Sequence, residues 1–441
     1  QGQALPHRFA NAFPPGYRER YQPTLALGDI DKMAALSADA PLGVDLYRPP
    51  VSPERALGLK LYQRGAPVLL SLCLPILEHM GLTVLEEHPF EIALAPGEPG
   101  IWLHDFHLSA KTPSPIDLAA VKATFESALA LVWSGAMEDD GFNQLVLLSG
   151  LDAREVALLR AYCKYLRQTG IAFSQAYMED TLAANPALAR RLVELFHARF
   201  DPAADPDRAA RQHDIEQAIA AALDQVASLD EDRILRSFLN LVQATLRTSF
   251  YQRDRAGLPL DRLSFKLASG EIAELPAPRP LVEIFVYAPG VEGIHLRGGK
   301  VARGGIRWSD RREDFRTEIL GLMKAQMVKN AVIVPVGAKG GFVPKRPPVE
   351  GGREAVLADG IACYKTLIRG LLDLTDNLVG QRVVPPEKVV RHDGDDSYLV
   401  VAADKGTATF SDIANGGSAE YGYWLGDACA SGGSAGYDHK A

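Results

Sequence analysis

The spacing of apolar residues at the start of the chain is typical of a small α+β module. Residues 67–80 have the apolar content of a helix, whereas three shorter runs bounded by turn residues are typical of strands. These predicted strands lie at 57–62, 82–87 and 101–108. Because strand–helix–strand–strand is half of a ferredoxin-like module, we predict an α+β module over residues 1–112. Plain packing and a regulatory small-molecule role both remain open for it.

The next part of the chain, residues 113–260, has apolar residues at helical spacing. Ser114 and Pro115 form a helix-start signal, and the Asp- and Pro-rich residues 200–207 predict an exposed loop. Further helices are predicted at 151–168, 186–199 and 214–229. No histidine here has a partner at metal-ligand spacing, so we predict a helical region without a metal site.

Strands and helices alternate over residues 261–441. The predicted strands are 281–287, 331–336 and 398–402, and the predicted helices are 313–330 and 354–378. Such alternation is typical of an α/β domain. The predicted fold class is therefore α/β for this domain and α+β for the chain overall.

Composition favours a folded, soluble protein. The chain has 441 residues, of which 47% are hydrophobic and 23% charged, which excludes a disordered or fibrous chain. The longest apolar run, 66–77, is interrupted by prolines and is shorter than the ~20 residues of a membrane-spanning helix. We therefore expect no membrane partner.

The four cysteines are far apart and form no CxxC pair, which favours reduced thiols in a cytoplasmic protein. No basic segment followed by an apolar one opens the chain, so no export signal is predicted. Both ends fall within polar passages, and we interpret the chain as a fragment.

Positive charge is concentrated in one glycine-rich stretch of an otherwise acidic chain. Residues 297–346 contain 12 Lys and Arg against 4 Asp and Glu, although the formal net charge is -8. This distribution predicts an anion-binding site. Nucleic acid is a weaker interpretation, because only Trp308, Phe315 and Phe342 are available for stacking in this stretch.

Within this stretch, Gly337, Gly340 and Gly341 flank Lys339, and the pattern predicts a tight loop. It matches neither known phosphate loop. The Walker A pattern fails, and no two glycines of the chain are separated by one residue, as GxGxxG requires. The lysine itself therefore becomes the candidate for chemistry.

Other charged residues frame this lysine in the sequence. Arg303 precedes two glycines in a predicted turn, Arg307 follows, and Lys329 ends a predicted helix on the same face as Gln326. Lys329 also fits simple complementarity to the helix dipole. Asp404 ends a buried-type strand, where it is either a helix N-cap or a site residue.

Four passages in this order resemble the catalytic core of glutamate dehydrogenases: 303–307, 325–329, 337–341 and Asp404. Residues 309–316 and 403–415 are similar to the large, NAD-specific bacterial class. That class carries ACT-like and helical modules before its catalytic segment, so the resemblance implies an ACT-like module at 1–112. It also implies NAD-dependent oxidative deamination of L-glutamate to 2-oxoglutarate and ammonia.

The resemblance implies two groups that bind the substrate. Arg303, followed by Gly304 and Gly305, holds one carboxylate. Gln326 and Lys329 bind the other end. The family pattern has lysine where this chain has Arg303, which affects the detail of binding more than the reaction.

The resemblance also implies that Lys339, in the loop of Gly337, Gly340 and Gly341, is the catalytic base. Asp404 then assists proton transfer. Lys339 is closer in sequence to the helix lysine than in the small enzymes, and the residue after Asp404 is a lysine where they have valine.

Physical chemistry fits these implied roles. Glutamate has two carboxylates, so its site needs at least two fixed cations. A second cation at ~4 Å costs roughly 4 kcal/mol at an effective dielectric of ~20, which lowers a lysine pKa from ~10.4 by ~3 units. We therefore expect Arg303 and Lys329 to crowd Lys339, with Asp404 facing it.

The cofactor implied by the resemblance is NAD, for which this chain offers no fingerprint. In the family the nucleotide-binding domain follows the catalytic segment, so we expect the fragment to be inactive alone. The family also implies a homo-oligomer, and the N-terminal module could bind an amino-acid effector. The alternative is a non-catalytic, amino-acid- or anion-binding regulatory protein.

Overall fold

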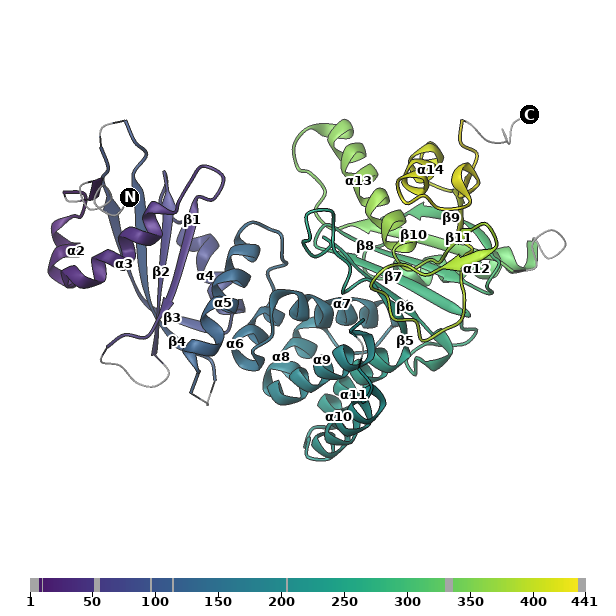
Figure 1. Cartoon of the computed structure of the whole chain (residues 1–441), viewed down its shortest axis with the longest axis horizontal. Coiled ribbons are helices and arrows are strands. Elements are labelled where there is room, and N and C mark those ends of the chain that lie inside the picture. Colours follow the sequence, from purple (N-terminus) through teal and green to yellow (C-terminus); the bar gives the residue numbers. More distant parts are fainter. Residues whose placement is uncertain are drawn as a thin grey trace. The chain divides into compact units, whose positions relative to one another are not determined.

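The computed structural model describes residues 8–9, 11–50, 56–95, 97–112, 115–203, 205–329 and 336–434, with only the backbone at 327–329. It divides into two compact units (Figure 1). The first comprises Gln1–Ala157 and Leu182–Arg190, and the second comprises Leu158–Thr181 and Arg191–Ala441. Within the described part, no helix is long and apolar enough to cross a membrane.

The first unit contains a four-stranded antiparallel sheet in the order β1-β2-β4-β3. Its strands are β1 (Leu42–Tyr47), β2 (Ala56–Arg64), β3 (Leu82–Ile92) and β4 (Ile101–Ala110). Its helices include α2 (Pro15–Arg20), α3 (Pro23–Ala34), α4 (Leu70–His79), α5 (Leu118–Trp133) and α6 (Leu145–Ser149). The predicted strand–helix–strand–strand order, β2-α4-β3-β4, is confirmed. Strand β1 was not predicted, because its six residues include Gly43 and Asp45, which interrupt an apolar run.

Helix α5 begins later than predicted. Its N-cap is Asp117, whose carboxylate accepts hydrogen bonds from the backbone N–H groups of Ala119 and Ala120. An aspartate at this position satisfies donors that the first turn leaves free, and it outweighs the Ser114–Pro115 signal. Ser114 itself lies outside the described residues.

Five helices follow: α7 (Ala153–Thr169), α8 (Gln175–Ala184), α9 (Pro186–Phe200), α10 (Arg208–Leu223) and α11 (Leu229–Ala244). The helix predicted at 214–229 is confirmed over 214–223 and wrong beyond that point. Helix α10 ends at Leu223, and Ser228 caps α11 by accepting a hydrogen bond from the Glu231 N–H. Three acidic residues in the first turn of α11 complement its dipole.

The second unit is built on an eight-stranded mixed sheet in the order β14-β13-β9-β10-β8-β7-β6-β5. The strands are β5 (Thr245–Thr248), β6 (Leu263–Leu267), β7 (Val282–Ala288), β8 (Val291–Arg297), β9 (Arg303–Trp308), β10 (Ala338–Pro344), β13 (Val400–Ala403) and β14 (Ala430–Ser431). Neighbours from β5 to β10 are antiparallel, and those from β10 through β9 and β13 to β14 are parallel. The predicted mixed α/β architecture is confirmed.

Helices cover both faces of this sheet. Helix α13 (Gly352–Leu372) and α14 (Ser411–Glu420) lie on one face (Figure 1), where Phe342 and Ile306 pack among Tyr364, Leu367 and Phe410. Helix α12 (Phe315–Lys329) lies on the other face. A Cβ built on Gly341 of β10 would meet Ile319 of α12 at 2.4 Å.

Two local predictions in this unit are wrong, and a third falls on residues that the structure does not describe. The helix predicted at 354–378 ends at Leu372, because residues 377–379 form β11 (Asn377–Val379), which pairs with β12 (Arg382–Val384). Residues 303–305 lie in strand β9 rather than in a turn. The predicted strand at 331–336 falls almost entirely outside the described residues.

The predicted loop of Gly337, Gly340 and Gly341 is also wrong, since Ala338–Pro344 is strand β10 and Gly337 bridges Arg303. A Cβ at position 340 would lie 2.4 Å from Ile306 Cδ1. These glycines therefore serve close packing between strand neighbours and α12, not a sharp turn.

Candidate active site

The charged residues of β9 and β10 share the face of the sheet that α12 covers. Side chains alternate along a strand, and Arg307 pairs in register with Gly341. Arg303, Arg307 and Lys339 consequently lie on the same face, whereas Trp308 and Phe342 lie on the opposite one. The strand pairing alone places these residues on one face, without the turns predicted from the glycines.

Lys339 and Asp404, which sequence reasoning placed in one site, are in contact. Lys339 Nζ lies 2.5 Å from Asp404 Oδ2, and Lys339 is 5% exposed. Asp404 directly follows β13, whose Ala402 pairs with Gly305 of β9. A Cβ at Gly305 would lie 3.0 Å from Asp404 Cβ, so the glycine lets the aspartate approach β9.

The Asp404 carboxyl is held in its charged form. Burial alone would raise its pKa. Hydrogen bonds from Lys339 and from the backbone N–H of Lys405 outweigh burial and hold the pKa below its usual range. The Thr407 hydroxyl accepts a hydrogen bond from the Asp404 N–H at 3.2 Å and fixes the turn that follows.

A second cation, Arg307, reaches the same carboxylate oxygen. Its Nε donates to Asp404 Oδ2 at 3.2 Å, and its Nη1 donates to Glu318 Oε1 at 2.9 Å. Ser309 Oγ donates to the other Glu318 oxygen at 2.6 Å. Sequence reasoning named Arg307 only as a nearby cation and missed Glu318 and Ser309. Arg307 lies two residues after Gly305, and this spacing could have placed it on the same strand face as the site.

Gln326 of α12 points toward the start of β9. A Cβ at Gly304 would lie 2.9 Å from Gln326 Oε1 and only 1.5 Å from the backbone oxygen of Ala338. Position 304 therefore has no room for a side chain. Gln326 Oε1 is buried and has no hydrogen-bond partner among the described residues. A buried amide oxygen without a partner is costly, and a ligand ammonium could satisfy it.

Arg303 and Lys329 are not seen to crowd Lys339. The exposed Arg303 side chain donates through Nε to Tyr398 Oη at 2.7 Å, and no described contact joins it to Lys339. The side chain of Lys329 lies outside the described residues, so its expected place in the cluster stays a prediction. The cation beside the Lys339–Asp404 pair is instead Arg307.

A buried network of ion pairs anchors the segment that carries Tyr398. Arg297 Nη1 donates to the backbone oxygen of Tyr398 and to Asp396 Oδ1, both at 2.9 Å. Lys266 Nζ lies 2.5 Å from Asp396 Oδ2. Burial opposes ionisation of Asp396, but Arg297 and Lys266 hold its pKa well below the usual range.

The network continues to two further aspartates. Arg247, fully buried, contacts Asp376 at 2.8 Å and Asp393 at 2.6 Å. These partners are more than 125 residues apart in sequence, and no motif signals their pairing. The network fixes the backbone on which Arg303 rests through Tyr398.

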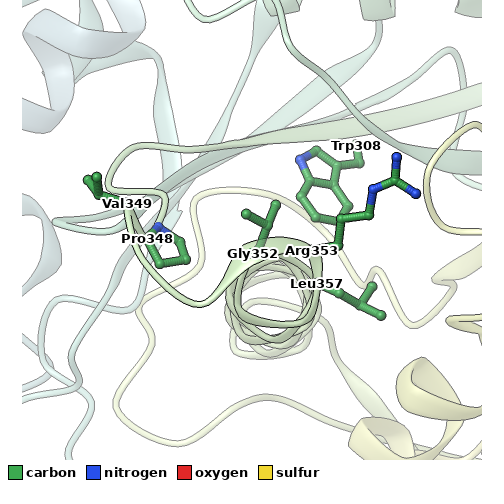
Figure 2. A pocket seen from close by; sticks show the side chains of 7 residues that line it. Trp308, Pro348, Val349, Gly352, Arg353 and Leu357 are labelled. Carbon is green, nitrogen blue, oxygen red and sulfur yellow. The ribbon is translucent and has the colours of Figure 1, made fainter.

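A surface hollow of about 460 Å³ lies next to Trp308, between the start of α13 and the loop before it (Figure 2). Its lining comprises Trp308, Pro348, Val349, Gly352, Arg353, Val356 and Leu357. Because Trp308 faces the α13 side of the sheet, this hollow is separated by the sheet from the Lys339–Asp404 pair. We therefore locate the candidate site by its charged groups and not by this hollow.

Comparison with known proteins decides the family. Residues 218–441, just over half of the chain, match the family model described as bacterial NAD-glutamate dehydrogenase, catalytic domain. The chain belongs to this family. Residues 41–121 match the glutamate dehydrogenase ACT3 domain, and 137–202 and 1–36 match helical motifs 3 and 2.

Curated NAD-specific glutamate dehydrogenases are similar along the whole chain. That of Pseudomonas aeruginosa is 54% identical over 435 residues, covering 98% of this chain and 27% of the relative. Those of Halomonas elongata and Mycobacterium tuberculosis are 52% and 51% identical, covering 99% and 100% of this chain and 27% and 28% of each relative. The chain thus spans about a quarter of the length of these relatives.

These matches confirm the family predicted from the sequence and the presence of an ACT-like module. The boundaries at residues 112 and 260 stay predictions, as do the roles of individual site residues. Among the described residues, no group of three or more His, Cys, Asp or Glu side chains is arranged to hold a metal ion.

Proposed function

We propose that this chain supplies the substrate-binding and proton-transfer groups of an NAD-dependent glutamate dehydrogenase, which converts L-glutamate to 2-oxoglutarate and ammonia. The observation that carries the proposal is the contact between Lys339 Nζ and Asp404 Oδ2 at 2.5 Å. It lies within the part of the chain that matches the catalytic domain of the family.

Substrate binding follows from the groups around this pair. Arg303 uses only its Nε among the described contacts, on Tyr398, so both Nη groups can form a two-pronged contact with one carboxylate. Gln326 Oε1 can accept a hydrogen bond from the substrate ammonium. We assign the second carboxylate to Lys329, which is one helical turn from Gln326.

Lys339 and Asp404 then handle protons. The substrate ammonium first loses one proton to solvent. When a hydride then leaves Cα, the substrate becomes an iminium, and water must attack it. Neutral Lys339 takes the proton of that water, and Asp404, within hydrogen-bond distance, stabilises the ammonium that forms. Release of ammonia needs a proton, which Lys339 returns to the leaving nitrogen, and the new hydroxyl group loses its proton to solvent as the carbonyl forms.

NAD, when bound, accepts the hydride. The chain has no pair of glycines separated by one residue, so it does not offer the usual turn for the dinucleotide phosphates. We assign no residue of this chain to NAD, and we expect turnover only when a nucleotide-binding domain is present.

The test is glutamate-dependent NADH formation by the complete enzyme that carries this chain. Lys339→Ala should abolish activity, because it removes the base. Lys324→Ala is the matched control: it removes an exposed lysine of α12 and should leave activity unchanged. Full activity in Lys339→Ala would contradict the proposed mechanism.

A second candidate function is binding of an amino acid without catalysis. The exposed Arg303 and the Gln326 oxygen, which has no hydrogen-bond partner within the described part of the chain, also permit it. The catalytic and the regulatory function are distinguished by measuring both glutamate binding, by calorimetry, and turnover. Binding that is lost in Lys329→Ala supports a substrate site. Binding without turnover in the complete enzyme favours the regulatory function.

We further propose a cytoplasmic homo-oligomer with an amino-acid effector at the ACT-type module. The cytoplasmic location is supported by the four cysteines, all of which are buried free thiols. The effector and the assembly rest on the resemblance to the family.

A further inference from the structure

The feature that carries the inference is one carboxylate oxygen shared by two cations. Asp404 Oδ2 is contacted by Lys339 Nζ at 2.5 Å and by Arg307 Nε at 3.2 Å. Both side chains approach from neighbouring strands, β10 and β9. The inference rests on the proposed role of Lys339 as the base.

A lysine in contact with a single carboxylate is a poor base. An opposite charge at this distance favours the charged form of the amine, and Lys339 is almost fully buried, where such an interaction is screened less than at the surface. The proposed reaction nevertheless requires Lys339 to lose its proton near neutral pH. Burial of an amine opposes its charge, and a second cation on the same carboxylate oxygen acts in the same direction.

We propose that Arg307 is a positioning residue that keeps Lys339 usable as a base by binding the same Asp404 oxygen. The guanidinium partly neutralises the carboxylate before Lys339 deprotonates. It also keeps the carboxylate in place when the lysine becomes neutral.

Arg307 is itself built into the structure. Glu318 of α12 accepts its Nη1 at 2.9 Å, and Ser309 fixes Glu318 through the other oxygen at 2.6 Å. The hydrogen bond that Arg307 donates to Glu318 raises the pKa of Arg307 above its usual value, so Arg307 stays charged at every pH at which the enzyme works.

The described charged groups around Lys339 come from several elements. Asp404 follows β13, Arg307 belongs to β9, and Glu318 belongs to α12 and contacts Arg307 rather than the lysine. On β8 the partner of Lys339 is the neutral Leu296. Lys405 follows Asp404 and contributes its backbone N–H to the carboxylate.

Arg303 and Lys329 are the other two cations of the substrate site proposed above. Arg303 shares the face of β9, and the side chain of Lys329 is outside the described residues. With Lys339 charged, the two cations and two carboxylates of the Lys339, Arg307, Asp404 and Glu318 group balance. Removal of Arg307 leaves a net negative group around the lysine, and removal of the Glu318 charge has the opposite effect.

The experiment compares the pH dependence of kcat/KM for glutamate in the complete enzyme and its variants. In Arg307→Gln the acid limb, which reports deprotonation of the base, should move to higher pH by about one unit, so that activity below the limb falls about tenfold. The activity at high pH should be retained. Arg307→Lys, which keeps the charge, should recover part of the shift.

Glu318→Gln should move the acid limb in the opposite direction, because it removes a negative charge while keeping an oxygen for the Ser309 hydroxyl. An acid limb that stays in place in both Arg307→Gln and Glu318→Gln overturns the inference, as does an equal loss of activity at all pH values. If Arg307→Gln does not fold, Glu318→Gln decides the question: an acid limb that stays in place in this variant overturns the inference.

The outcome for Lys339→Ala separates this inference from the proposed function. An inactive Lys339→Ala together with unshifted Arg307 and Glu318 variants overturns only the role of Arg307. An active Lys339→Ala overturns the base itself, and the role of Arg307 with it.

Discussion

The buried Arg247–Asp376 pair gives a sharp prediction for stability. Asp376 is fully buried and accepts hydrogen bonds from Arg247 at 2.8 and 3.1 Å, from Arg391 at 3.1 Å and from the Asp396 N–H at 2.7 Å. Asp376→Ala removes the anion and leaves the Arg247 guanidinium in the interior. Breaking one partner of a buried pair costs roughly 3–5 kcal/mol.

The structure places the expected loss at the lower end of this range. Arg247 Nε retains Asp393 at 2.6 Å, so its charge is not left wholly unpaired. We expect Asp376→Ala to lower the free energy of unfolding of the second unit by about 3 kcal/mol, or roughly a hundredfold in the unfolding equilibrium.

Asp395→Ala is the matched control, because Asp395 also pairs with Arg391, at 2.7 Å, but its side chain is 61% exposed. An exposed pair contributes less than about 1 kcal/mol. Urea unfolding of the chain, followed by circular dichroism, measures both variants. Equal losses in the two variants, or a loss below about 1 kcal/mol in Asp376→Ala, would refute the argument from burial.

Two further predictions concern the sheet. In Gly304→Ala the new Cβ would meet the Ala338 oxygen at 1.5 Å, so β9 must shift and calorimetry should show glutamate binding at least tenfold weaker; Gly321→Ala, which has open space on α12, should bind normally and gain up to about 1 kcal/mol of helix stability. Burial and Arg297 lower the pKa of His295 to about 3. Between pH 6.5 and 3 the unfolded chain therefore binds more protons than the folded chain, and the free energy of unfolding should decrease by up to about 1.4 kcal/mol for each unit by which the pH is lowered. His295→Leu should flatten this dependence in acid unfolding, since both ring nitrogens lack partners among the described residues; an unchanged slope would show that His295 is not its source.

The contact between Lys339 and Asp404 could be expected from the sequence because each residue belongs to a short, specific passage. Their order along the chain resembles that of a known catalytic core, and the distance of 2.5 Å agrees with it. The fold class could be expected for a similar reason. Alternating strands and helices leave few architectures that bury both faces of a sheet.

The conformation of the glycine-containing segments around residues 304 and 340 could not be predicted from the sequence. Glycine pairs are typical of turns, but here Gly340 and Gly341 lie within a strand. Glycine is needed at these positions because Ile306 and Ile319 fill the space that a Cβ would need. Only the packed structure contains that information. The same ambiguity placed Gly304 and Gly305 in a turn rather than in β9.

The buried ion network was also beyond sequence reasoning. Arg247 and Asp393 are 146 residues apart, and a lone arginine or aspartate in a sequence is usually exposed. Their pairing depends on where β5 and the segment before β13 come to lie in the fold. Arg307 was named as a nearby cation but given no role, because Arg303 and Lys329 of the same stretch matched the family pattern.

Strand β10 has three strands on one side and four on the other, and it is where the antiparallel half of the sheet meets the parallel half. Lys339 therefore projects from the interior of an eight-stranded sheet, and the amides of such a central strand should exchange with deuterium only on global opening. Asp404 follows the short β13, one strand from an edge formed by the two-residue β14. When the proton moves, the amine should consequently keep its place, and the contact with Arg307 limits any adjustment of the carboxylate.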